Sequence, residues 1–138
     1  MARIILGVIV GFVVWTVIWL GSDQVLIMMS KSWYGQHQFA LEDSLLNQAP
    51  FTADNTILLI GVIRGLIASL MAGFIAAFVA GENRKSPLAL GILLLLAGLG
   101  VQIGLWNYIP VWYHAIFLLL LIPATVIGGR LRSGTMTA

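Results

Sequence analysis

The stretch of sequence that decides the fold is residues 56–80, TILLIGVIRGLIASLMAGFIAAFVA, which is apolar apart from one arginine and two hydroxyl side chains. A helix needs roughly 20 apolar residues to cross the hydrocarbon core of a bilayer, and this stretch exceeds that length. Small residues recur in it at every fourth position: Gly61, Gly65, Ser69, Gly73 and Ala77. Because ridges of small residues let helices approach closely in lipid, the stretch predicts a transmembrane helix that packs tightly against its neighbours.

A second row of small residues runs beside the first one: Ala68, Ala72, Ala76 and Ala80. Two rows on one helix allow each row to serve a different partner. Shorter pairs occur in other apolar stretches, at Gly7 and Gly11 and at Gly100 and Gly104. We expect these residues to pack the helices of the chain against one another; a row that faces a different protein is the alternative.

Three further apolar stretches complete the pattern, so that the predicted spans are about 4–21, 56–80, 87–105 and 110–129. The remaining residues suffice for one sizeable outer loop, at 22–55, and for no separate soluble domain. The sequence therefore predicts an all-α, polytopic integral membrane protein. We expect a compact four-helix bundle in which residues 1–138 form a single membrane domain.

Several helix boundaries follow from local signals. The residues just before Thr56 include good helix caps, and Ser86 followed by Pro87 is typical of a helix start. The pair Gly128 and Gly129 predicts the end of the fourth span. In the outer loop two questions stay open: whether 25–29 extends the first helix, and whether 39–46 forms a short surface helix or an ordinary loop.

The composition excludes several classes of protein. Charged residues make up 9% of the chain, far below the about 25% of a soluble domain. The absence of cysteine excludes disulfide exchange and thiolate metal sites, and two separate histidines do not predict a metal centre. Basic residues are scattered, so no nucleic-acid surface is expected. No motif for a cofactor or for catalysis is present.

Charge also predicts the orientation. The basic residues that flank the spans fall on one side: Arg3, Arg84, Lys85, Arg130 and Arg132. The other side has Lys31 with the acidic residues Asp23, Glu42, Asp43 and Asp54. The positive-inside rule then places both termini in the cytoplasm and the 22–55 loop outside, in a membrane that we expect to be the bacterial inner membrane.

Arg64 is the first candidate for a functional site, because an arginine about 12 Å below the membrane surface needs a partner or must extend to the surface. Helical side chains lean toward the N-terminus, which for this span is the outer side, so extension to the surface is one arrangement. The other is an ion pair with Asp23, which requires that the first helix continue through residues 25–29.

Further polar and aromatic candidates lie in the same outer half: Gln102, His114, Trp106, Trp112 and Tyr113. Gln102 and His114 are expected to face each other across the hairpin of the third and fourth spans, as an interhelical hydrogen bond. The aromatic residues are typical of an interfacial belt. The inner half has mainly apolar and small side chains, which disfavours an autonomous channel or pump.

Three functions are compatible with this pattern. An accessory, assembly or stabilising subunit of a larger membrane complex, or a homo-oligomer, explains the packing rows and the lack of catalytic motifs. A protein that binds or transports a lipid or small amphiphile is the alternative, with Arg64 holding an anionic headgroup. An integral membrane enzyme ranks third, with Asp23 or Glu42 and His114 as acid and base.

Overall fold

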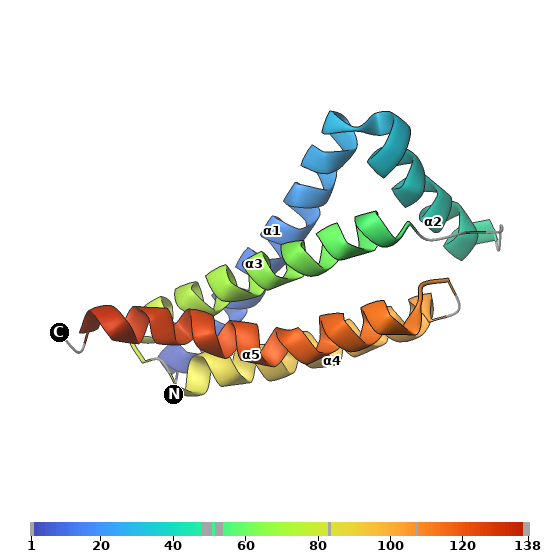
Figure 1. Ribbon diagram of the computed structural model, residues 1–138. Helices are drawn as coiled ribbons and strands as arrows, with labels where there is room; N and C mark the ends of the chain where they lie inside the picture. The colour runs from blue at the N-terminus through green and yellow to red at the C-terminus, as the bar shows by residue number, and fades with distance from the viewer. Residues whose placement is uncertain (1, 48–50, 52–53, 83, 107, 137–138) are drawn as a thin grey trace.

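The structure of the chain is a computed structural model; the description covers residues 2–47, 51, 54–82, 84–106 and 108–136, with side chains as far as Leu131. In this part of the chain all regular structure is helical, as the sequence predicted. The elements in chain order are α1 Ala2–Met29, the π-helical turn η1 Lys31–Gly35, α2 Gln36–Asn47, α3 Asn55–Ala80, α4 Lys85–Leu105 and α5 Val111–Met136 (Figure 1). Four of them, α1, α3, α4 and α5, are long and apolar enough to cross a membrane.

The long helices pack so that α3 lies between α1 and α5, while α4 pairs with α5 (Figure 1). The start of α1 and the end of α5 lie at one end of the bundle, which we call the terminal end. The opposite end, the hairpin end, holds α2 and the turn between α4 and α5. Toward the hairpin end α1 diverges from α4 and α5, and η1 and α2 lead back to the start of α3.

The two rows of small residues on α3 face two different helices. A Cβ added to Gly73 would overlap the carbonyl oxygen of Thr125 in α5, so only glycine allows this approach. On the α1 side, a Cβ added to Gly7 would lie 2.6 Å from the carbonyl oxygen of Ala76. Further glycines of the first row, Gly61 and Gly65, lie against aromatic rings of α5. Each row therefore holds one neighbour of α3 at short range.

The pair Gly100 and Gly104 does not serve the packing that we expected of it. No atom of a neighbouring residue lies within 4 Å of a Cβ built at either position. Both residues lie on the exposed face of α4, because the pairing of α4 with α5 uses other positions, among them the buried Gly91. Within the described chain this pair has no helix opposite it.

The helix of the fourth span does not end at Gly129, since α5 continues to Met136, although its candidate membrane span, Val111–Leu131, ends close to the predicted residue 129. Both glycines of the expected stop signal are buried inside the helix. A Cβ on Gly128 would overlap the carbonyl oxygen of Leu70, and one on Gly129 would overlap the ring of Pro87. These glycines permit close packing against α3 and α4, which explains their presence without a helix end.

The first helix also continues beyond its predicted end, through residues 22–29 to Met29. The reason is tertiary. Ser22 and Asp23 would be poorly solvated as helical residues at the edge of an apolar span, but both bind polar groups of the bundle. Most of the predicted outer loop is therefore helical. Residues 39–46, for which a short helix and an ordinary loop were both left open, lie in α2.

Carboxylates cap two helices. Asp54 caps α3 by accepting hydrogen bonds from the backbone N–H groups of Thr56 and Ile57, in agreement with the sequence. Ser86 does not cap α4. Glu82 instead accepts from three successive N–H groups, those of Arg84, Lys85 and Ser86. Burial would raise the pKa of Glu82, but these hydrogen bonds lower it to about 2.

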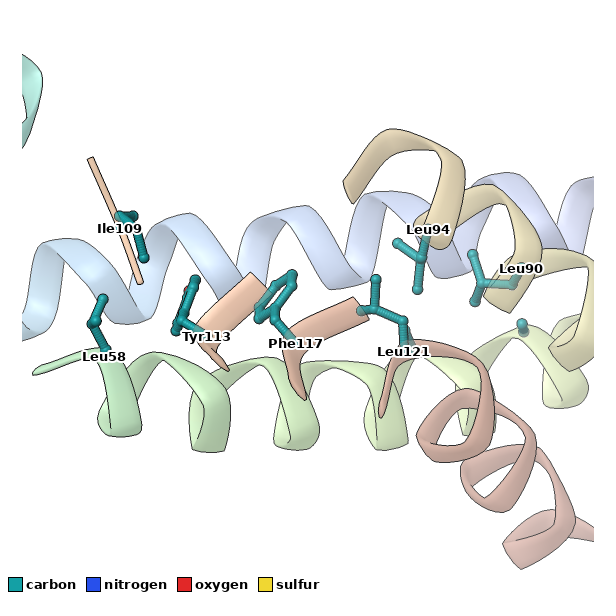
Figure 2. Packing of buried hydrophobic residues seen from close by; sticks show 9 residues of the cluster. Leu58, Leu90, Leu94, Ile109, Tyr113, Phe117 and Leu121 are labelled. Atoms are coloured by element: carbon teal, nitrogen blue, oxygen red, sulfur yellow. The ribbon is translucent and has the colours of Figure 1, made fainter. Parts of the chain in front are cut away.

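The apolar core lies between α1, α3, α4 and α5. Figure 2 shows Tyr113, Phe117 and Leu121 in a row along α5, at the four-residue spacing that keeps side chains on one face of a helix. Leu90 and Leu94 of α4 lie beside the end of this row that is nearer the terminal end. Tyr113, Phe117 and Leu121 line one side of the cavity described next.

Candidate functional site

Arg64 is the centre of a polar cluster between α1, η1 and α3. Its side chain is only 9% exposed, and its Nη1 lies 3.6 Å from Oδ1 of Asp23. Its Nε donates to Ser22 Oγ at 2.8 Å, and its Nη1 donates to Tyr34 Oη at 2.8 Å. Its Nη2 donates to the carbonyl oxygen of Trp19, whose ring centroid is 4.1 Å from Cζ. The guanidinium therefore binds inside the bundle instead of extending to the surface.

Hydrogen bonds continue from Asp23 through α2 to the start of α3. Tyr34 Oη and Gln38 Nε2 donate to Oδ1 of Asp23, at 2.7 and 2.9 Å. The Oε1 of Gln38 is 2.9 Å from Nδ1 of His37, and the backbone N–H of Asp54 donates to Nε2 of the same ring at 3.1 Å. Because Nε2 accepts and Nδ1 faces an acceptor, His37 is a neutral imidazole with its proton on Nδ1.

Two pKa shifts outside the long helices fit this network. Burial raises the pKa of the Tyr34 hydroxyl, and its hydrogen bond to Asp23 raises it further, so the phenol remains a donor. The pKa of Asp54 is lowered, first by a hydrogen bond from the Trp33 indole N–H at 2.8 Å and then by the N–H groups that it caps. In this network, N–H and O–H donors at fixed positions bind the carboxylates of Asp23 and Asp54.

Gln102 and His114 meet across α4 and α5, as expected from the sequence. The amide Oε1 contacts Nδ1 of the imidazole, and the imidazole Nε2 is 3.1 Å from the carbonyl oxygen of Ile109. Trp106 covers the imidazole in a stack with ring centroids 4.6 Å apart. His114 is completely buried, and both of its ring nitrogens are engaged.

Aromatic rings connect the polar cluster with the core. Trp15 and Trp19 stack with centroids 5.3 Å apart, and Trp19 meets the edge of Phe117 at 5.3 Å. The indole N–H of Trp15 donates to Ser69 Oγ at 3.0 Å, which ties α1 to α3 through a residue of the first row of small residues. These rings give the space beside Arg64 rigid walls.

A cavity of about 410 Å³ lies in the half of the bundle nearer the hairpin end. This volume falls in the range of about 300–1,000 Å³ that is usual for small-molecule sites. Its lining is mainly apolar and comes from every helix, α2 included. Leu20 of α1 and Ala97 and Val101 of α4 belong to the lining and are exposed, so the wall of the cavity reaches the outer surface of the bundle on α1 and on α4.

Two polar groups in the cavity lack hydrogen-bond partners among the described residues. Tyr113 is 6% exposed and Gln102 is 4% exposed, and both line the cavity. The hydroxyl of Tyr113 contacts no donor or acceptor, and the amide of Gln102 has a partner on one of its two polar atoms only. No fully enclosed side-chain nitrogen or oxygen lacks a partner among the described residues, so these two atoms are accessible from the cavity. Each is therefore a place where a ligand or a water can form a hydrogen bond.

The structure brings most of the sequence-predicted candidates to this cavity. Arg64, Gln102 and Tyr113 line it. Asp23 and His114 do not line it but contact two of these lining residues, Arg64 and Gln102 respectively. Trp106 stacks on His114, and Trp112 meets the edge of Tyr113 at 6.2 Å.

Sequence reasoning missed several residues of the site. Tyr34, His37 and Gln38 come from the predicted outer loop. Tyr34 of η1 and Gln38 of α2 donate to Asp23, and His37 contacts Gln38. Trp19 was read as part of an apolar run, but its carbonyl oxygen binds Arg64. The available signal was the spacing of Trp15, Trp19 and Ser22, which places an aromatic face and a hydroxyl on one side of an extended helix.

The acidic and imidazole side chains named as acid and base candidates can be compared with the contacts that they make. Among the described residues no group of three or more His, Asp or Glu side chains is placed to hold a metal ion. Asp23 is engaged by Arg64, and His114 by Gln102 and a backbone carbonyl, so neither is free to transfer a proton to a ligand in this arrangement. Compared with protein-family models, with curated proteins and with solved structures, the chain matches none.

Proposed function

We propose that this chain is an integral membrane protein that binds an uncharged, mainly apolar small molecule or lipid in the cavity beside Arg64. The cavity is the observation that carries the proposal: a four-helix bundle with no ligand to accommodate has no need of about 410 Å³ of space lined by rings. Leu20 and Ala97 line the cavity and are exposed, so we place its entrance between α1 and α4, which suits a molecule that arrives from the lipid phase.

The proposed ligand is uncharged because Arg64, the only arginine or lysine among the described residues that line the cavity, already has an acidic partner. Arg64 was expected to hold an anionic headgroup in the lipid-binding alternative. Its guanidinium instead has Asp23 beside it and donates to Ser22, Tyr34 and the carbonyl of Trp19. An anion would have to compete with Asp23 for that charge, at a cost in desolvation.

The proposed orientation places both termini and the terminal end in the cytoplasm, and the cavity in the outer half of a bacterial inner membrane. Basic side chains at the terminal end support this orientation: Arg3, Arg84, Lys85 and Arg130. Since the chain has no cysteine, single cysteines report topology cleanly. In intact cells a membrane-impermeant thiol reagent should label Glu42→Cys, and Lys85→Cys only after permeabilisation; the reverse pattern contradicts the orientation.

Binding is tested by filling the mouth of the cavity. Ala97→Trp places a large ring where a small exposed side chain lines the opening, whereas Leu96→Trp changes an outward residue of the same helix that is not part of the lining. We expect apolar molecules that co-purify with the wild type in mild detergent, measured by mass spectrometry, to be lost in Ala97→Trp and kept in Leu96→Trp. Equal retention in both variants would remove the basis for the proposal.

An accessory, assembly or stabilising subunit remains the second candidate, and Gly100 and Gly104 favour it. No described residue lies within 4 Å of a Cβ built at either glycine, so this side of α4 suits close approach by a helix of another membrane protein. Gentle purification of the wild type should then recover the same partner protein each time, and the Gly100→Leu variant should no longer recover it. The enzyme function gains no support, because His114 is enclosed on both ring nitrogens.

A further inference from the structure

The contacts of His114 determine which atom of Gln102 faces the cavity. Both ring nitrogens of His114 lie against oxygen atoms, the carbonyl of Ile109 and Oε1 of Gln102. A neutral imidazole has one N–H, so it satisfies only one of two acceptors. A doubly protonated ring would be a completely buried charge with no carboxylate against it among its described contacts.

The conflict is resolved by turning the amide. The oxygen and nitrogen of a glutamine amide have nearly the same shape and are assigned from their hydrogen bonds, whereas the carbonyl of Ile109 has a fixed identity. His114 then donates through Nε2 to Ile109 and accepts at Nδ1 from the Gln102 N–H group. The atom of Gln102 left without a partner is consequently its carbonyl oxygen, an acceptor.

The second free group, the hydroxyl of Tyr113, both donates and accepts. Tyr113 and Gln102 both line the cavity, the Tyr113 hydroxyl beside Gly61 of α3 and the Gln102 amide on α4, so the free hydroxyl and the free amide face the same space. One acceptor and one donor-acceptor are complementary to a group that donates one hydrogen bond and accepts another. A hydroxyl group has this property; an ether or ester oxygen only accepts.

We propose that the molecule bound in the cavity is an amphiphilic alcohol: its hydroxyl donates to Gln102 Oε1 and accepts from Tyr113, and its hydrocarbon part lies along Phe117, Leu121 and Leu94. This inference rests on the proposed binding function and specifies its ligand class. Residues of the apolar lining continue from Tyr113 along α5 toward the terminal end, so they provide the place for the hydrocarbon chain (Figure 2).

The experiment compares four probes of equal chain length: dodecan-1-ol, its methyl ether, dodecane and dodecanoate. Purified full-length protein in nanodiscs is incubated with each deuterated probe, and the retained amount is measured by mass spectrometry. We expect the alcohol to bind about tenfold more tightly than the ether, which leaves the Gln102 oxygen unsatisfied. Dodecanoate should bind less well than the alcohol, because a carboxylate faces an acceptor at Gln102.

Variants separate this proposal from the binding function itself. Gln102→Leu should bring the alcohol down to the affinity of the ether, and Tyr113→Phe should weaken alcohol and ether together; Phe39→Leu, an exposed change on α2, should alter neither. The thermal midpoint of each variant shows whether it is folded. If Gln102→Leu unfolds, Gln102→Glu serves as the second variant, because its carboxylate can still accept a hydrogen bond from the alcohol.

The outcomes are distinct. If alcohol, ether and alkane bind equally and all are lost in Ala97→Trp, the cavity binds ligands but the hydroxyl assignment is wrong. If alcohol binding exceeds ether binding in the wild type and still does so in Gln102→Leu, the role of Gln102 is likewise overturned. If no probe binds, or Ala97→Trp retains them all, the proposed function fails together with its ligand class.

Discussion

Arg64 of α3 and Asp23 of α1 form an ion pair in the interior of the bundle, with Nη1 and Oδ1 3.6 Å apart. The pair does not stand alone, since the guanidinium also donates to Ser22, Tyr34 and the carbonyl of Trp19. Asp23 in turn accepts from Tyr34 and Gln38. Four elements, α1, η1, α2 and α3, are thereby joined at the wall of the cavity. Removing one member takes a hydrogen-bond or charge partner away from its neighbours in the network.

Of the two members of the ion pair, removal of the Arg64 guanidinium should lower the free energy of unfolding more. Arg64→Met leaves Asp23 with a charge that no cation balances, and we expect the free energy of unfolding to fall by about 3 kcal/mol or more. Asp23→Asn should cost less, because the amide still accepts from Tyr34 and Arg64 retains three other acceptors. Unfolding by SDS titration, followed by circular dichroism, measures both; the double variant should lose clearly less than the sum of the two single losses.

Exchanging Arg64 and Asp23 tests whether the neighbours of the ion pair, and not only its opposite charges, are needed for stability. Asp23→Arg combined with Arg64→Asp preserves the opposite charges but places a carboxylate opposite the carbonyl of Trp19, which needs a donor. We expect the exchanged protein to be no more stable than the single variants. Full recovery of stability would mean that charge pairing alone, without the bonds to Ser22 and Trp19, holds α1 to α3.

Close approach of α3 and α5 at Gly73 is the next prediction. A methyl group at this position overlaps the carbonyl oxygen of Thr125, so Gly73→Ala must separate the two backbones. We expect a loss of about 1–3 kcal/mol in the same unfolding measurement. Gly100→Ala is the matched control, because nothing lies near a Cβ at that position and the loss there should be close to zero.

The hydrogen bond between Trp15 and Ser69 should contribute modestly. Its indole N–H and hydroxyl are 3.0 Å apart between α1 and α3, and bonds of this kind in membrane proteins contribute about 0.6 kcal/mol on average. Ser69→Ala should therefore lower the free energy of unfolding by roughly that amount. A loss several times larger would indicate that Ser69 also sets the position of Trp15 at the cavity.

Stability should depend on pH through Glu82. Its pKa is about 2 in the folded chain against an ordinary value of 4.5, so the unfolded chain binds the proton first as the pH falls. The contribution of Glu82 is fully present above about pH 4.5 and is lost as the pH falls through about 2. Glu82→Gln should cost about 1 kcal/mol at neutral pH, as for loss of a helix cap, and should reduce the difference between the thermal midpoints at neutral pH and at about pH 3.

Much of the fold was predictable because it depends on local composition. Apolar length alone predicted four long helices, and the position of Asp54 predicted the start of α3. The spacing of small residues on α3 predicted close packing on two sides, since residues four apart share one face of a helix. His114 and Gln102 were also predictable as a pair, because the short turn between α4 and α5 leaves them at matching depth.

Tertiary structure decided the rest. Whether α1 stopped at Gly21 or reached Met29 depended on partners for Ser22 and Asp23, and those partners lie on α3 and η1. Gly128 and Gly129 carry the sequence signature of a helix end, yet they lie inside α5 because α3 and α4 approach them closely. The sequence by itself determined which segments are helical and apolar; only the packing decided that α1 diverges from α4, leaves a cavity between them, and turns Arg64 from a free cation into a neutralised part of its wall.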